Sequence, residues 1–119
     1  MTEIRNSKRY DLEERTLQFA ERVGTYVNKL PKTIPNMENG KQLTRAAGST
    51  GANYIEANES LSKKDFVMRV KICRKEAKES RYWLRLTRPL PPEISEKEKL
   101  AQEATEFVKI FTAILSKSA

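Results

Sequence analysis

Apolar residues recur along most of the chain at steps of three and four residues, the spacing that lines one face of an α-helix. This pattern predicts four helices, at about residues 11–30, 36–59, 62–87 and 95–116, and no credible strand. The connections between them are short, which favours antiparallel packing of neighbouring helices. We therefore predict a single domain over residues 1–119 with an all-α fold, an antiparallel up-and-down four-helix bundle.

Capping and proline signals set the predicted ends of these helices. Leu30-Pro31 should end the first helix, because the residue before a proline is pushed out of the α region, and Pro89 should end the third. Asn36 is a candidate N-cap for the second helix. The other three starts have the spacing of a capping box, in which two side chains satisfy the first backbone N–H groups: Asp11 with Glu14, Ser62 with Asp65, and Ser95 with Glu98.

A run of small residues occupies the second predicted helix at 46–52. Gly48 and Gly51 each cost about 1 kcal/mol relative to Ala in a helix interior. Such a cost is tolerated where another backbone must come close, so the run predicts a tight contact between helices. A break or bend in the helix is the alternative. A phosphate-binding loop is not supported, because the run lacks the P-loop pattern and follows no strand.

The third predicted helix concentrates the charge of the protein. Residues 63–88 hold ten Lys or Arg against three Asp or Glu, a balance of +7 that equals the net charge of the whole chain. On a helix, six of these cations fall in one stripe, which favours a phosphate-rich partner. A solvated face laced by Glu76 and Glu79 is the alternative. The candidate nucleic-acid-binding residues are Lys71, Arg74, Lys78, Arg81, Arg85 and Arg88.

A second set of side chains on the same helix is apolar and points away from the predicted core. Large apolar side chains in a line are costly to leave in water, so they favour a subunit interface, with Trp83 as its anchor. Cover by the fourth helix or by the N-terminal arm is the alternative. Tyr82 and Trp83 could also stack on exposed bases. The predicted oligomer interface consists of Met68, Ile72, Trp83 and Leu86.

The composition argues against an enzyme. The chain has no His, the commonest general base, and its single Cys73 falls in an apolar stripe. Glu56 and Glu59 are more typical of ion pairs than of a metal site, and Arg45 or Arg81 is a plausible partner for Glu56. We expect no catalytic, cofactor-binding or metal-ligating residues. The absence of an 18-residue apolar run and of a secretory signal favours a cytoplasmic protein.

Two blocks of sequence resemble a known family. The stretch from Arg45 to Glu56, RAAGSTGANYIE, is similar to the pattern R-A-A-x-S-[IV]-x-A-N-I-x-E, from which it departs at Thr50 and Tyr54. The second block is Lys64-Asp65-Phe66 followed by Ala77-x-x-Ser80-Arg81-Tyr82-Trp83-Leu84-Arg85-Leu86. The chain thereby resembles, over about residues 9–116, the four-helix bundle proteins encoded in 23S rRNA intervening sequences, which are related to accessory variability determinant proteins of diversity-generating retroelements.

This resemblance implies a closed four-helix bundle, a homopentamer and a bacterial cytoplasmic setting. In the retroelement relatives it implies binding of nucleic acid and of a reverse transcriptase through basic surfaces. For the intervening-sequence members it implies no established molecular function.

Two functions are therefore compatible with the chain. The first is a non-enzymatic, oligomeric nucleic-acid-binding protein that binds RNA rather than DNA through the basic stripe. The second is a scaffold whose basic face docks an acidic protein, such as a reverse transcriptase. Neither function involves a membrane.

Overall fold

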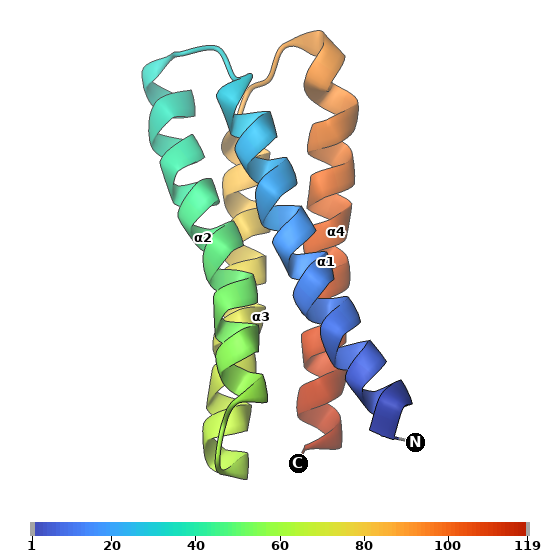
Figure 1. Ribbon diagram of the computed structural model, residues 1–119. Coiled ribbons are helices and arrows are strands. Elements are labelled where there is room, and N and C mark those ends of the chain that lie inside the picture. Colours follow the sequence, from blue (N-terminus) through green and yellow to red (C-terminus); the bar gives the residue numbers. More distant parts are fainter. Residues whose placement is uncertain (1, 119) are drawn as a thin grey trace.

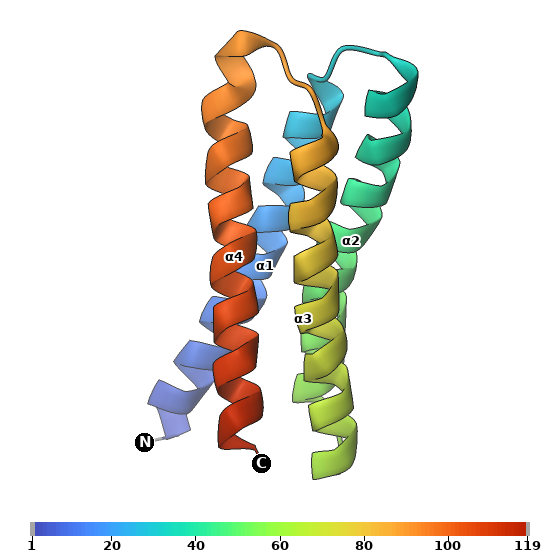
Figure 2. The same ribbon diagram turned by 180° about the vertical axis from the view of Figure 1, so that it is seen from behind.

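The computed structural model describes residues 2–118, with side chains from residue 11 onward, and contains four long helices (Figure 1). They are α1 (Thr2–Asn28), α2 (Ile34–Asn58), α3 (Lys63–Leu86) and α4 (Ile94–Lys117), and a short 3-10 helix, η1 (Pro91–Glu93), precedes α4. No strand occurs among the described residues. Neighbouring helices run antiparallel, and α1 lies diagonally opposite α3 (Figures 1 and 2). The predicted all-α four-helix bundle is confirmed.

The start of α3 agrees with the prediction, and the start of α1 does not. Ser62 is the N-cap of α3, and its Oγ accepts a hydrogen bond from the backbone N–H of Asp65 at 3.1 Å. In contrast, α1 begins at Thr2, so Asp11 lies inside the helix and the predicted capping box with Glu14 is wrong. No Pro or Gly precedes Asp11, so nothing in the sequence stops the helix from extending to the N-terminal side.

The predicted N-cap at Asn36 is also wrong. Thr33 caps α2, because its Oγ1 accepts the backbone N–H of Asn36 at 3.2 Å. Asn36 itself is buried, with 3% of its surface exposed. Its Nδ2 donates to the carbonyls of Pro31 and Arg88, both at 3.0 Å, and its Oδ1 accepts the N–H of Arg88 at 2.9 Å. One amide therefore holds together the α1–α2 and α3–α4 connections.

The capping box predicted at Ser95 and Glu98 is wrong because α4 begins earlier. Pro91 and Pro92 form η1, which leads directly into α4 at Ile94. Proline has a φ that suits the first turn of a helix, so the helical winding is already established before Ser95. Glu93 occupies the N-cap position and makes no side-chain capping hydrogen bond.

The core is a single cluster of buried side chains from all four helices. It contains the residues that the helical periodicity indicates, among them Phe19 on α1, Leu43 on α2, Val70 on α3 and Phe107 on α4, each at most 1% exposed. The rings of Phe19 and Phe107 meet edge to face, with centroids 5.3 Å apart. This shared core fixes which side of each helix is left for solvent.

Gly51 lies at a tight contact between α1 and α2. A Cβ atom added there would lie 2.8 Å from Oγ1 and 3.1 Å from Cβ of Thr16 on α1. A Cβ at Gly48 would meet nothing within 4 Å. The tight contact that we predicted from the small residues is thus confirmed at Gly51 alone. The alternative of a break is wrong, since α2 is continuous from Ile34 to Asn58.

These two glycines should respond in opposite ways to alanine. Gly48→Ala should raise the free energy of unfolding by about 0.5–1 kcal/mol, because Ala favours the helix and has open space. Gly51→Ala should lower it by about 1–3 kcal/mol, because the added methyl group overlaps Thr16. Urea unfolding followed by circular dichroism measures both, and equal stabilisation of the two variants would contradict the close approach of α1 and α2.

Candidate nucleic-acid interface

Five cations of the basic stripe lie on α3, which Figure 2 shows beside α4, and the sixth, Arg88, follows the C-cap residue Thr87 just beyond the helix. Arg81 shows that the side of α3 that carries the stripe faces α4, because its Nη1 donates a hydrogen bond to Oγ1 of Thr105 on α4 at 3.3 Å. Arg74 and Arg81 are half-buried, and the other four are exposed: Lys71, Lys78, Arg85 and Arg88. The helical spacing places Lys71, Arg74, Lys78, Arg81 and Arg85 in one row along α3, and Arg88 lies next to its C-terminal end.

No ion pair among the side chains of residues 11–118 involves any of the six stripe cations. Glu76 and Glu79 lie on the opposite flank of α3 and face α2. There they pair with Arg45 at 3.7 and 3.4 Å. The interpretation that these two carboxylates lace the stripe is wrong. The predicted partner of Glu56 is wrong as well, since Arg45 pairs with α3 and Arg81 with Thr105.

Two carboxylates of α4, those of Glu96 and Glu103, are directed away from the stripe, toward α1. Arg15 binds Glu103 through two hydrogen bonds of 2.8 Å. Arg22 binds Glu96 in the same bidentate way at 3.1 Å. Hydrogen bonding to these carboxylates raises the pKa of both arginines, and burial opposes it. A weaker pair joins Lys29 to Glu93 at 3.8 Å. The α4 carboxylates that face α1 are thus paired with arginines of α1.

Lys97 on α4 adds a seventh cation next to the stripe. Its Nζ donates to the carbonyl oxygen of Thr87 at 2.8 Å, at the C-terminus of α3. A cation is favourable there, because helix C-termini carry partial negative charge. Burial and the nearby Arg88 lower the pKa of Lys97. Sequence reasoning missed this residue, since its place near Arg88 follows only from the antiparallel packing of α3 and α4.

The predicted oligomer interface is divided between surface and core. Met68 and Leu86 are exposed, at 48% and 37%. Ile72 is half-buried, and Trp83 is partly buried and packs against the core. The indole Nε1 of Trp83 is buried without a hydrogen-bond partner among the described residues. Met68 and Leu86 are therefore the accessible members of this set.

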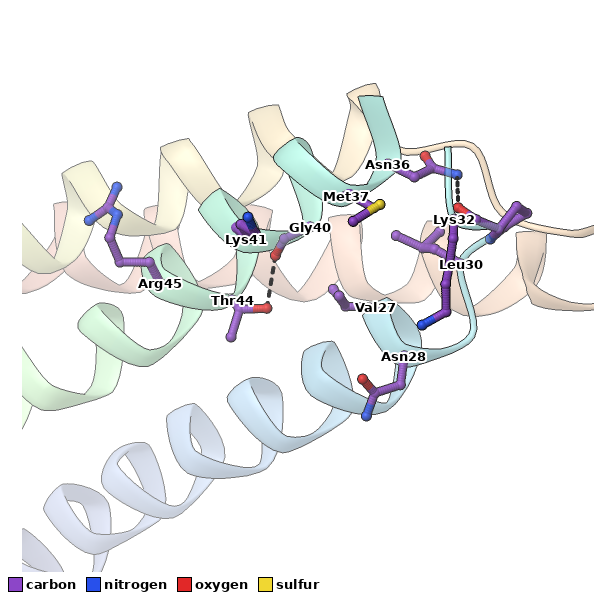
Figure 3. A pocket seen from close by; sticks show the side chains of 11 residues that line it. Val27, Asn28, Leu30, Lys32, Asn36, Met37, Gly40, Lys41, Thr44 and Arg45 are labelled. Atoms are coloured by element: carbon purple, nitrogen blue, oxygen red, sulfur yellow. Dashed lines mark hydrogen bonds between the residues drawn. The ribbon is translucent and has the colours of Figure 1, made fainter. Parts of the chain in front are cut away.

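A separate pocket of about 480 Å³ lies between the end of α1 and the start of α2 (Figure 3). Its wall is mostly apolar, and Lys41 and Arg45 belong to its lining. The hydroxyl of Thr44 donates to the carbonyl of Gly40 at 2.8 Å. No His, Cys, Asp or Glu lines the pocket, so it holds no acid–base pair of an enzyme.

The rest of the described chain offers little for catalysis. Among the side chains of residues 11–118, no group of three or more His, Cys, Asp or Glu could hold a metal ion. Cys73 is fully buried, and burial raises the pKa of its thiol to about 12. A thiol with such a pKa supplies almost no thiolate near neutrality, which argues against a redox or nucleophilic role. No helix in the part that the structure describes is long and apolar enough to cross a membrane.

The fold and the charge distribution define the class: an all-α four-helix bundle with one open cationic edge. The model of the family described as 23S rRNA-intervening sequence protein matches residues 8–113, so the chain belongs to that family. A solved structure is similar over 92% of this chain and 98% of its own, at 28% identity and a TM-score of 0.75. It is a protein of unknown function from the S23 ribosomal protein family of Bacteroides thetaiotaomicron. Comparison with curated proteins finds no match.

The α1–α4 ion pairs can be tested by removing one carboxylate. Glu103→Gln should lower the free energy of unfolding by about 1 kcal/mol, because a partly buried, bidentate partner of Arg15 is lost. Glu106→Gln is the matched control, since Glu106 lies on the same helix in a more exposed pair with Lys109. It should cost less than about 0.5 kcal/mol. Equal losses in urea unfolding would contradict a special role for the Arg15–Glu103 pair.

Proposed function

We propose that this protein is a non-enzymatic, oligomeric RNA-binding protein of the bacterial cytoplasm that binds phosphate groups through the basic stripe of α3. The observation that carries the proposal is the set of six cations on one edge, with no ion pair among the described side chains. Unpaired cations of this kind release counterions from a nucleic acid when they bind it, which drives association.

The chemistry of the stripe favours affinity over sequence specificity. Arg presents a planar fork of donors to phosphate oxygens, and Lys presents a point charge. No motif that reads base edges in a duplex groove is present in the sequence. We favour RNA over DNA because the exposed ring of Tyr82 beside the cations of the stripe suits the unpaired bases of RNA loops and single strands.

Assembly would increase the effect of a single stripe. In a homo-oligomer, for which we propose a pentamer, several stripes would be arranged around one axis. Linked binding sites bind a long polyanion far more tightly than one site, because each later contact is intramolecular. Met68 and Leu86 support assembly, since they are exposed apolar side chains on the same helix.

Charge reversal should distinguish the contribution of the basic stripe to RNA binding from that of other surface cations. Lys78→Glu with Arg85→Glu should reduce RNA binding at least tenfold, because two exposed phosphate contacts become repulsive. Lys32→Glu with Lys41→Glu is the control, as it makes the same charge change near the α1–α2 pocket. Fluorescence anisotropy with labelled RNA measures both. For six phosphate contacts, the logarithm of the affinity should fall with the logarithm of salt with a slope of about −4 to −5.

Two outcomes would argue against RNA as the partner. Equal binding by the stripe variant and the control variant would remove the stripe as the binding site. Recovery of a protein after nuclease treatment of a pulldown, with no RNA recovered without that treatment, would instead support docking of an acidic protein on the same face.

The proposed assembly predicts a particle mass. Light scattering should give about five times the 13.7 kDa of one chain. Met68→Glu should lower that mass, because a buried carboxylate in an apolar interface is unfavourable. Leu17→Glu is the control, since Leu17 is exposed to a similar degree, 51%, on α1. A wild-type mass of a single chain, or an unchanged mass for Met68→Glu, would contradict the predicted interface.

A further inference from the structure

The residues Lys78, Tyr82 and Arg85 form an outer ridge of α3, in which an exposed aromatic side chain lies between two cations. Tyr82 has 57% of its surface open to solvent. Lys78 and Arg85 lie four residues before it and three residues after it, and both are exposed. Residues at these separations are neighbours on a helix surface. Tyr82 therefore has a cation on either side along the ridge.

The ring of Tyr82 is supported from within the bundle. It meets the ring of Trp83 edge to face, with centroids 5.0 Å apart and planes at 73°. Trp83 packs against the hydrophobic core, so it provides a fixed support. A ring held in this way loses little conformational freedom when it makes a new contact.

The nearest carboxylate along the helix does not compete for the flanking cations. Glu79 lies three residues before Tyr82, and its Oε1 lies 3.4 Å from the guanidinium of Arg45 on α2. Lys78 and Arg85 take part in no ion pair described for residues 11–118. The ridge thus combines free cations for phosphate groups with a supported aromatic ring.

We infer that Tyr82 stacks on an unpaired base, so that the basic stripe takes single-stranded RNA or an RNA loop. The inference rests on the proposed RNA binding and adds the class of RNA. The faces of bases inside a duplex are covered by the neighbouring base pairs, whereas an unpaired base offers its face to a side chain. Aromatic rings combined with flanking cations are a common way to bind single strands without reading their sequence.

The test compares Tyr82→Leu with Tyr82→Phe on two RNA probes at equal salt. One probe is a labelled oligoadenylate of about a dozen nucleotides, and the other is a blunt RNA duplex of the same length. Tyr82→Leu should weaken binding of the oligoadenylate by about 5- to 150-fold and leave duplex binding unchanged. Tyr82→Phe should bind both as the wild type does. A fluorescent adenine analogue in the oligoadenylate should be quenched by the wild type and by Tyr82→Phe, but not by Tyr82→Leu.

Equal effects of Tyr82→Leu on the two probes, or no effect on either, would overturn the stacking role. A fall in particle mass of Tyr82→Leu in light scattering, with loss of both probes, would also overturn it, because Tyr82 would then act through assembly. These results leave the proposed function in place. Failure of the wild type to bind either probe would remove the proposed function and the stacking role together.

Discussion

The two bidentate ion pairs between α1 and α4 help to determine which charged side chains of this bundle remain without a partner. Arg15 with Glu103 and Arg22 with Glu96 satisfy carboxylates of α4 on the side that faces α1. The carboxylates at 76 and 79 of α3 are directed in the same way toward α2. These carboxylates of α3 and α4 are thus used in pairs between helices, and the cations of the basic stripe are left without an ion pair among the described side chains.

This arrangement has an energetic cost in α3. Like charges four residues apart on a helix are unfavourable by about 0.2–0.5 kcal/mol for each pair. The cost is opposed by the other side of the same helix, where Val70, Cys73, Ala77 and Leu84 are fully buried. Burial of apolar side chains contributes more than the repulsion removes, at about 1.5–3 kcal/mol for a large one. The helix can therefore carry a concentrated charge because its core face is well packed.

The periodicity of apolar residues was sufficient to predict the four helices and the core, because one face of each helix must be buried. The helix starts were less predictable. Asp11, Asn36 and Ser95 have the residue types of caps, but polar residues of these types also occupy the surface or make tertiary contacts. Only Ser62 caps its helix as predicted. Polar and acidic residues are frequent in a highly charged helix, so capping-box spacings also arise where no cap is formed. The pattern alone therefore does not identify the N-cap residue.

The charge stripe itself could be predicted from spacing, but its neighbours could not. Which flank of α3 faces α2 depends on how the helices are arranged around the core, and the pattern along one helix is silent on that arrangement. The Arg45 pairs with Glu76 and Glu79, and the place of Lys97 beside Arg88, follow from it. Trp83 was predicted to point away from the core, yet it packs against the edge of the core. The buried face of α3 is therefore wider than its central row of core residues.

The position of Asn36 bears on domain swapping, the exchange of an element between two copies of the chain. The residues at 59–62 are the covalent link between the α1–α2 hairpin and the α3–α4 hairpin. At the other end of the bundle, the buried amide of Asn36 joins the two hairpins through Pro31 and Arg88. Exchange of hairpins between molecules requires this end to open. The hydrogen bonds of this amide therefore oppose domain swapping. As a result, each bundle, with its basic edge, is made from a single chain.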